Sequence, residues 1–169
     1  MSHSRDTSVV VQELFGGAEH EVLVSTFVVQ HVADVFRPLA LRMDRVPSLR
    51  VRIFLHVGRE WRETSEDSEL LREFADHLRA DWPGERRPEV YYDPRGLSSD
   101  PAARATWHAK CVVIDDELAL VTSANFTEWA QQRNVEAGVL IRNRPFAMQL
   151  RQQFESLVQS KQVRRLAGV

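Results

Sequence analysis

The sequence predicts a single α/β domain over residues 1–169, with a mixed central sheet flanked by helices. Strand-like and helix-like segments alternate along the chain, which is typical of layered α/β folds. The composition is 43% hydrophobic and 27% charged, close to the average for globular domains, and 169 residues can bury one hydrophobic core. Neither an internal repeat nor a long linker is visible in the sequence.

The composition also excludes several classes of protein. Cys111 is the only cysteine, which excludes a disulfide-stapled scaffold and a multi-thiolate zinc site within one chain. The longest apolar stretch, 22–29, is too short to span a membrane, and the first residues lack the apolar core of a signal peptide. A cytoplasmic protein that does not act at a membrane is therefore expected. The net charge of −2 indicates no global attraction to nucleic acid.

The first elements are a helix, a strand and a second helix. A hydroxyl residue at position 7 or 8 can cap a helix over 7–15, which two glycines end. Bulky and β-branched residues over 21–29 predict a buried strand. Apolar residues at positions 32, 35, 36, 39 and 43 then follow the period of a helix. Pro38 interrupts that face, so a kink or a restart of the helix is expected there.

The middle of the chain predicts two more strands around a third helix. Apolar residues alternate with Arg50 and Arg52 over 49–57, which indicates a strand. Apolar residues at 70, 71, 74 and 78 predict a helix, and Pro83 with Gly84 ends it. A short strand follows near 90–92. The next stretch, 93–103, is rich in Pro, Gly, Ser and Asp and predicts a loop.

The last part of the chain predicts three strands and a helix. The strands are expected at 106–114, 118–122 and 135–141, and the turn 115–117 joins the first two as a hairpin. A final amphipathic helix is expected to start near Pro145. The expected order of elements is therefore α-β-α-β-α-β-β-β-β-α.

The strand over 106–114 carries the most informative residues. His108 and Lys110 are two positions apart, so they are expected to project from the same face, while Cys111 and Val113 anchor the opposite face in the core. An imidazole beside an ammonium is costly to bury. The ammonium favours a neutral, nucleophilic imidazole. An anion bound between the imidazole and the ammonium would explain why both groups lie on one face of the strand.

Two further segments add polar groups next to the neighbouring strands. Ser123 and Asn125 follow the strand 118–122 and can offer donors to an oxyanion. Asn134 and Glu136 share one face of the next strand, where Glu136 can accept a hydrogen bond from an imidazole and fix its tautomer.

Some of these residues also have plain structural interpretations. Asp115 lies in a hairpin turn, where a structural role is as reasonable as a catalytic one. Ser123 and Asn125 can cap a helical turn. Trp107 is expected to pack or to contact a second copy rather than to stack on a base, whereas Trp129 and Arg133 fit either a substrate groove or a solvated loop. The remaining histidines have no metal-ligand spacing, and no metal site is expected.

Together these segments resemble the phospholipase D superfamily, whose motif is H-x-K-x-x-x-x-D, then G-S-x-N, then N-x-E. In this sequence the three parts are His108, Lys110 and Asp115; Thr122, Ser123 and Asn125; and Asn134 and Glu136. Thr122 stands where the family usually has glycine; the larger threonine can crowd a phosphate cradle, but Ser123 and Asn125 are intact, so activity is expected to survive.

The resemblance implies a layered phospholipase D-like domain and phosphodiester cleavage with no metal or other cofactor. It implies that His108 is the nucleophile or the acid in a reaction through a phosphohistidine. Lys110, Ser123 and Asn125 would bind the phosphate, and Glu136 would orient His108. Asp115, the last residue of the first motif, is expected to hold the strand end rather than to touch substrate.

The single motif also implies a two-fold homodimer, because the family's reaction uses two histidines and this sequence has one H-x-K. Small Nuc-type endonucleases of the family are built in this way, which favours DNA or RNA as the substrate. The segments 121–127 and 134–141 also resemble the phospholipase D-like component of DISARM antiphage systems, so other defence subunits are candidate partners. A nucleic-acid-binding subunit with weak catalysis and a lipid phosphodiesterase stay open as alternatives.

Overall fold

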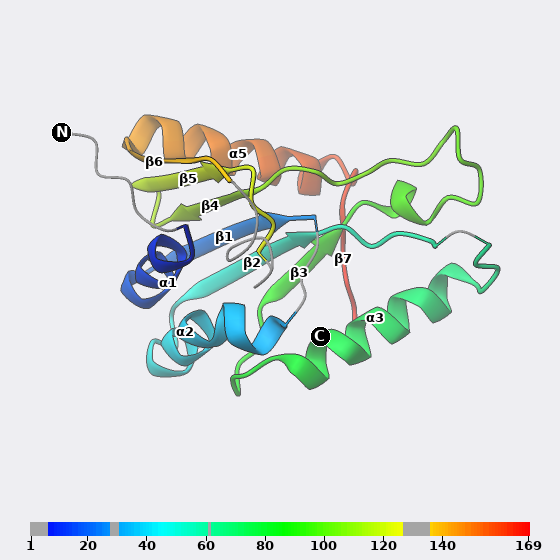
Figure 1. The fold of residues 1–169 in the computed structure, drawn as a ribbon, viewed down its shortest axis with the longest axis horizontal. Helices are drawn as coiled ribbons and strands as arrows, with labels where there is room; N and C mark the ends of the chain where they lie inside the picture. Colours follow the sequence, from blue (N-terminus) through cyan, green and yellow to red (C-terminus); the bar gives the residue numbers. More distant parts are fainter. Residues whose placement is uncertain (1–6, 28–30, 61, 127–135) are drawn as a thin grey trace.

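A computed structural model describes residues 7–27, 31–60, 62–126 and 136–169. Seven strands form one mixed sheet in the order β6-β5-β4-β1-β2-β3-β7, with helices on both faces (Figure 1). The strands are β1 (Glu21–Thr26), β2 (Arg50–Leu55), β3 (Glu89–Tyr92), β4 (Cys111–Ile114), β5 (Leu118–Thr122), β6 (Gly138–Arg142) and β7 (Arg164–Arg165). The helices are α1 (Thr7–Gly17), α2 (Val32–Arg45), α3 (Asp67–Asp81) and α5 (Arg144–Gln159), with a short 3-10 helix, η1 (Pro94–Leu97). The α/β class with a mixed, helix-flanked sheet is confirmed.

The sheet joins a parallel half to an antiparallel half. β1, β2 and β3 are parallel, as expected for strands joined by the crossover helices α2 and α3. β4 runs antiparallel to β1, and β4, β5 and β6 form an antiparallel meander. The carboxyl ends of β1 and β5 therefore meet the amino ends of β4 and β6 at one end of the sheet.

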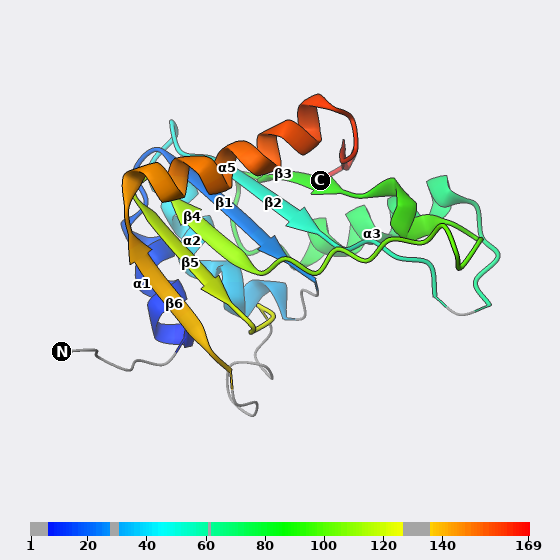
Figure 2. The ribbon, with the colours of Figure 1, turned by 90° about the horizontal axis from the view of Figure 1, so that it is seen from above.

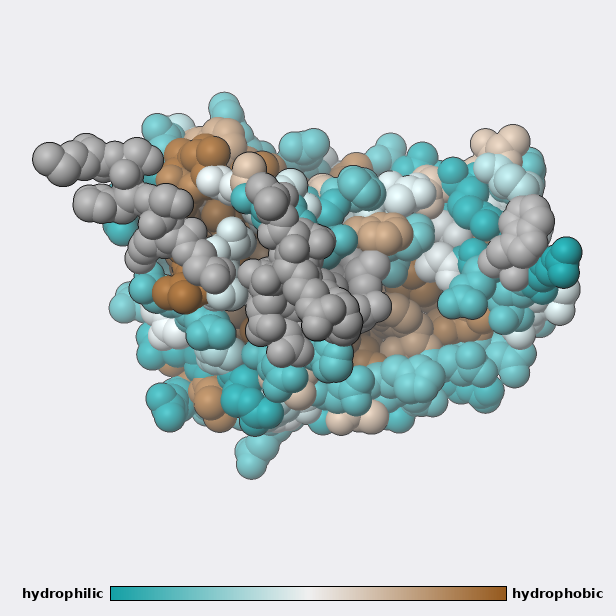
Figure 3. Space-filling view, in the orientation of Figure 1, coloured by the Kyte–Doolittle hydropathy of each residue, from teal (hydrophilic) through white to brown (hydrophobic). Residues whose placement is uncertain are grey.

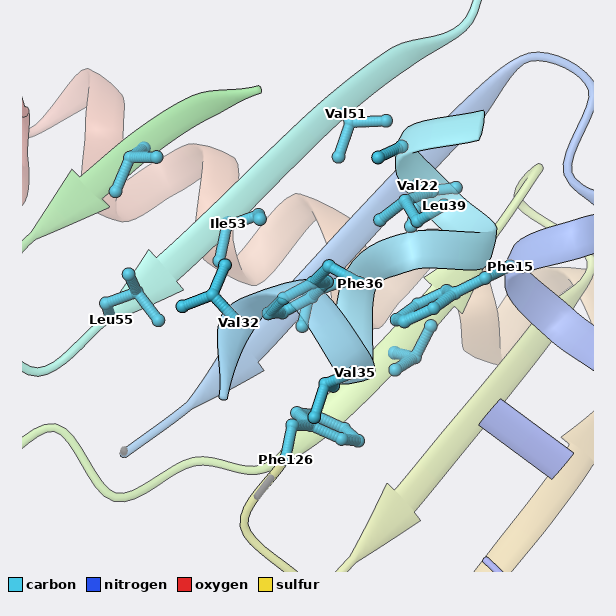
Figure 4. Close-up of a cluster of buried hydrophobic side chains, with 14 of the residues drawn as sticks. Phe15, Val22, Val32, Val35, Phe36, Leu39, Val51, Ile53, Leu55 and Phe126 are labelled. Carbon is cyan, nitrogen blue, oxygen red and sulfur yellow. The ribbon is translucent and has the colours of Figure 1, made fainter. Parts of the chain in front are cut away.

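Two apolar clusters hold the layers together. α1 and α2 pack on one face of the sheet and α5 on the other (Figure 2). On the first face, Phe36 and Leu39 of α2 point toward Val22, Ile53 and neighbouring strand residues (Figure 4). The outward side of α3 is hydrophilic (Figure 3), which agrees with an amphipathic helix. Among the described residues, no helix combines the length and the apolar character that crossing a membrane requires.

Ion pairs add to the attachment of α5. Arg52 of β2 is 4% exposed and lies 2.6 Å from Glu21 and 3.1 Å from Glu155 of α5. Arg151 of α5 lies 2.5 Å from Asp116 in the hairpin turn between β4 and β5. Glu155 thus ties α5 to β2 in the parallel half of the sheet, and Arg151 ties it to the β4–β5 turn in the antiparallel half, so α5 links the two halves.

Four expectations from the sequence need correction. β4 begins at Cys111 rather than at residue 106, and β1 ends at Thr26, with residues 28–30 outside the described part. α2 runs through Pro38 as one helix, so the alternative of a restart is wrong, because a proline removes one donor but the buried face of α2 continues on both sides of it. β6 begins at Gly138, and residue 135 lies outside the described part.

The chain also forms two elements that the sequence pattern does not predict. η1 begins the expected loop, where Asp93 accepts a hydrogen bond from the backbone N–H of Arg95. β7 extends the sheet beyond β3 by two residues.

Candidate active site

The candidate site lies at the end of the sheet where β1 and β5 finish and β4 and β6 begin. The segment before β4 supplies His108 and Lys110, and the turn after β5 supplies Ser123 and Asn125. The residues before β6 supply Glu136. The backbone N–H of Thr122 donates to the carbonyl of Lys110 at 3.1 Å, and that of Ser123 donates to the carbonyl of Ala137 at 2.9 Å. These bonds bring the three segments together.

His108 and Lys110 contact each other directly, so the expectation that they share a face is confirmed. The Lys110 ammonium lies 3.3 Å from Nδ1 of His108 and donates to the His108 carbonyl at 3.0 Å. The His108 residue is exposed, whereas Lys110 is only 9% exposed. Because an ammonium can only donate, Nδ1 of His108 accepts, and a neutral ring then carries its proton on Nε2.

Lys110 pairs with no carboxylate among the described residues. Its partners are the ring nitrogen and the carbonyl of His108, both uncharged acceptors when the ring is neutral. Burying an ammonium without a counter-charge is costly. The arrangement therefore favours an anion beside Lys110, within reach of the exposed imidazole.

The residues 107–109 are held by side chains rather than by strand pairing. The Ser25 hydroxyl donates to the carbonyl of Ala109 at 2.9 Å and accepts from Nε1 of Trp107 at 2.9 Å. The backbone N–H of Trp107 donates to Nδ1 of His56 at 3.3 Å. These contacts explain why the segment stays extended although β4 begins only at Cys111.

Aromatic rings pack against the segment that carries His108. The Trp107 ring lies 5.9 Å from the ring of Phe54 and 5.8 Å from that of Phe154, so Trp107 packs as expected. The Phe27 ring lies 5.6 Å from the His108 ring and stacks on His56 at 4.8 Å. Burial lowers the pKa of His56, which favours the neutral ring that accepts from Trp107.

The thiol of Cys111 faces away from the site, as expected. Cys111 packs in the apolar cluster under α5, and burial raises its pKa to about 12. The thiol is therefore protonated at neutral pH, and it is not a nucleophile.

The turn after β5 carries a hydroxyl and an amide. The Ser123 hydroxyl donates to the Glu136 carboxylate and accepts from the backbone N–H of Ala137 at 3.0 Å. Oδ1 of Asn125 is buried and has no hydrogen-bond partner among the described residues. Because an unpaired buried polar atom is costly, this end of the Asn125 amide favours a ligand group, and turning the amide over presents its NH₂ donor there.

Thr122 is accommodated by its partner on the next strand. Its hydroxyl donates to the Ala137 carbonyl at 3.2 Å and accepts from the backbone N–H of Ala124 at 3.1 Å. A Cβ added to Gly138, the cross-strand partner, would lie only 3.2 Å from Cβ and Oγ1 of Thr122. The glycine at position 138 thus leaves room for the threonine side chain at position 122. The two hydrogen bonds of the Thr122 hydroxyl hold the turn after β5 in place.

Asp115 lies at the opposite end of β4 from Lys110, about 16 Å away at the usual rise per strand residue. Its carboxylate accepts hydrogen bonds from the backbone N–H groups of Glu19 at 2.8 Å, His20 at 2.7 Å and Glu21 at 2.7 Å. The structure therefore does not bring Asp115 to the other motif residues. Its bonds hold the start of β1 against the end of β4.

We expect Asp115→Ala to lower the free energy of unfolding by about 3 kcal/mol, because three N–H groups lose their acceptor and alanine disfavours the φ of 52° at this position. The unfolding temperature should fall by about 6–12 °C. Below that temperature kcat should stay within about twofold of the wild type. Thermal unfolding and steady-state kinetics measure both; a large loss of kcat with unchanged stability would give Asp115 a catalytic role instead.

The motif residue Asn134 and the loop residues Trp129 and Arg133 lie outside the described residues. No group of three or more His, Cys, Asp or Glu side chains that could hold a metal ion occurs in the described part. The sequence reasoning missed Ser25, Thr26, Phe27 and His56. The one signal for the first two was a pair of hydroxyl residues at the end of an otherwise apolar strand.

Comparisons with known proteins identify a family and a distant relative. The family model "Cardiolipin synthase, PLD-like domain" matches residues 11–158. The DISARM protein DrmC of Bacillus paralicheniformis is 28% identical over 138 residues, which are 81% of this chain and 50% of DrmC. The chain thus spans half the length of that curated relative.

Two solved structures share the fold. Nuc of Salmonella typhimurium, a phospholipase D family member, has a TM-score of 0.57 at 18% identity, over 93% of this chain and 88% of Nuc. Phosphatidylserine synthase of Haemophilus influenzae has a TM-score of 0.62 at 17% identity, over 93% of this chain and 36% of the synthase.

Proposed function

The chain belongs to the phospholipase D superfamily, and we propose that it is a phosphodiesterase that cleaves DNA or RNA through a phosphohistidine on His108. The observation that carries the proposal is the nearly buried Lys110 ammonium, which has no carboxylate partner among the described residues and lies 3.3 Å from the exposed His108 ring. This pair offers a positive charge for a phosphate and a nucleophile at the same point.

Substrate binding would begin with an exchange of partners. A phosphate oxygen draws the Lys110 ammonium away from Nδ1 of His108 and accepts further hydrogen bonds from Ser123 and from the amide of Asn125. Nδ1 can then carry the ring proton, which leaves the Nε2 lone pair free to attack. Glu136, released from the Ser123 hydroxyl, would accept the Nδ1 proton in a hydrogen bond and stabilise the positive ring.

The reaction then runs in two displacements. Nε2 of His108 attacks phosphorus, the bond from phosphorus to the leaving oxygen breaks, and a second imidazole gives that oxygen a proton. Water next attacks phosphorus while the second imidazole takes a proton from it. The phosphorus–nitrogen bond breaks, which releases a phosphomonoester and restores His108. Lys110 and Asn125 hold the non-bridging oxygens throughout.

We assign the second imidazole to His108 of a second copy of the chain. The sequence contains one H-x-K motif, and the His108 residue is exposed, as a shared site requires. Two exposed valines also flank this end of the sheet: Val121 is 42% and Val139 is 61% exposed, and they pair across β5 and β6 next to the Thr122–Gly138 pair. A second copy would cover this apolar surface.

Nucleic acid is the favoured substrate for two reasons. The given sequence carries one H-x-K motif, as the Nuc-type endonucleases do, and its fold matches 88% of Nuc but 36% of the phosphatidylserine synthase. The relative DrmC carries the name of a DISARM protein, which supports a role in antiphage defence with other subunits as partners.

The direct test is cleavage by the purified protein in excess EDTA. We expect turnover of bis(p-nitrophenyl) phosphate and nicking of plasmid DNA or cleavage of a labelled RNA, because the chemistry uses imidazoles and an ammonium only. Phosphatidylcholine vesicles should be left intact. DNA binding without hydrolysis of any phosphodiester would contradict the proposal, and so would hydrolysis confined to the vesicles.

A further inference from the structure

We propose that Ser25 and Thr26, the last two residues of β1, are positioning residues that hold the two halves of the site. The inference rests on the proposed function, because the site they hold is the proposed phosphodiesterase site. Both residues are 0% exposed. Adjacent strand residues point to opposite faces of the sheet, so each hydroxyl reaches a different segment of the site.

Ser25 fixes the residues on either side of His108. Its hydroxyl donates to the carbonyl of Ala109 and accepts from Nε1 of Trp107, both at 2.9 Å. The Trp107 ring is in turn packed on Phe54 and Phe154. The backbone of His108 is therefore tied down at both neighbours, while the residue itself stays exposed.

Thr26 fixes the phosphate-binding turn from the other face. Its hydroxyl oxygen accepts from the backbone N–H of Phe126 at 3.3 Å. Phe126 is fully buried in the apolar cluster between the sheet and the first helices. Asn125 is the preceding residue, so this bond fixes the backbone that carries its buried amide oxygen.

The core itself does not need these hydroxyls. The preceding residues of β1, from Val22 to Val24, are apolar and fully buried. Alanine at position 25 or valine at position 26 would keep nearly the same side-chain volume without a hydroxyl. A buried hydroxyl is tolerated only when it is hydrogen-bonded. Both hydroxyls are bonded to the backbone or side chain of a site segment, which gives them a positioning role beyond packing.

The test compares hydroxyl deletions with a matched core substitution. Ser25→Ala should lower kcat by about 10–100-fold with KM changed less than about threefold, since the His108 nucleophile is misaligned while the residues that bind the phosphate are still present. Thr26→Val, which keeps the shape, should raise KM by about tenfold, and Thr26→Ser should restore it. The control is Val24→Ala, which leaves a small cavity next to the same strand, and it should keep kcat and KM within about twofold of the wild type.

Unfolding temperatures and NMR spectra complete the experiment. Ser25→Ala should shift the His108 ring resonances and Thr26→Val should speed hydrogen exchange at the Phe126 amide, whereas Val24→Ala should do neither. These two readouts do not depend on activity, so a wild type that cleaves nothing would overturn the proposed function while the positioning role is still measured. Wild-type kinetics and an unmoved His108 spectrum in Ser25→Ala would overturn the inference, as would an equal kinetic loss in Val24→Ala.

Discussion

Replacing His108 with alanine is expected to lower kcat for a small phosphodiester by about 10⁴-fold or more, because the reaction loses both its nucleophile and its acid. The residue is exposed, and its ring lies against the half-buried Phe27 and the Lys110 ammonium, so the unfolding temperature should stay close to that of the wild type. Steady-state kinetics measure the loss of kcat, and thermal unfolding measures the unfolding temperature. His77→Ala, which removes an exposed histidine from α3, is the control and should keep full activity.

The same variant tests whether two copies share one site. In co-refolded mixtures of wild type and His108→Ala, a site that needs both imidazoles makes activity fall with the square of the wild-type fraction. A linear fall, together with a monomer in analytical ultracentrifugation, would show that one chain suffices. The dimer in the account would then be wrong even if His108 is the nucleophile.

Replacing Lys110 with methionine is expected to lower kcat/KM by about 10²–10³-fold, because the negative charge on the non-bridging phosphate oxygens loses its cationic partner. Methionine has a similar length and needs no counter-charge, so the protein should be as stable as the wild type or more stable. The kinetics of a small phosphodiester and the unfolding temperature measure both effects. Lys161→Met changes the other lysine, an exposed one, and should leave both unchanged.

The result for Lys110→Met separates two roles of the ammonium. If Lys110 served only to hold the His108 carbonyl, the variant would lose stability and activity together. Activity close to that of the wild type would mean that no anion binds beside Lys110, and the geometric basis of the proposal would be lost.

Local patterns in the sequence were sufficient to predict most of the fold. The alternation of polar and apolar residues over 49–57 and the helical spacing from Val32 to Met43 follow from which side of each element faces the core. β2 and α2 form there, with bounds that differ by a few residues. The motif spacing likewise placed Lys110 beside His108, because an extended chain puts alternate side chains on one side.

The limits of prediction are clearest at the start of β4. Alternation over 106–114 indicates an extended backbone, but it contains no information about what the backbone bonds to. For residues 107–109 the partners are the side chains of Ser25 and His56, which are 84 and 51 residues away in the sequence. The Lys110 carbonyl accepts from the backbone of Thr122, and strand pairing to β1 starts only at Cys111. Long-range contacts of this kind depend on the packed fold, and the alternation of polar and apolar residues within one segment does not predict them.

Asp115 and β7 show the same limit. The turn pattern allowed both a structural and a catalytic Asp115, and only the folded chain brings the N–H groups of residues 19–21 to its carboxylate. β7 consists of Arg164 and Arg165, which have no strand-like pattern, and it exists because the edge of β3 offers free backbone groups.

The stereochemical course at phosphorus is the most direct test of the central claim that His108 forms a covalent bond to the substrate. The experiment uses a phosphodiester made chiral with oxygen isotopes or one sulfur atom, cleaved in isotopically labelled water. Two successive displacements, the first by His108, predict overall retention of configuration. Inversion would mean that water attacks phosphorus directly, and the phosphohistidine mechanism would be contradicted.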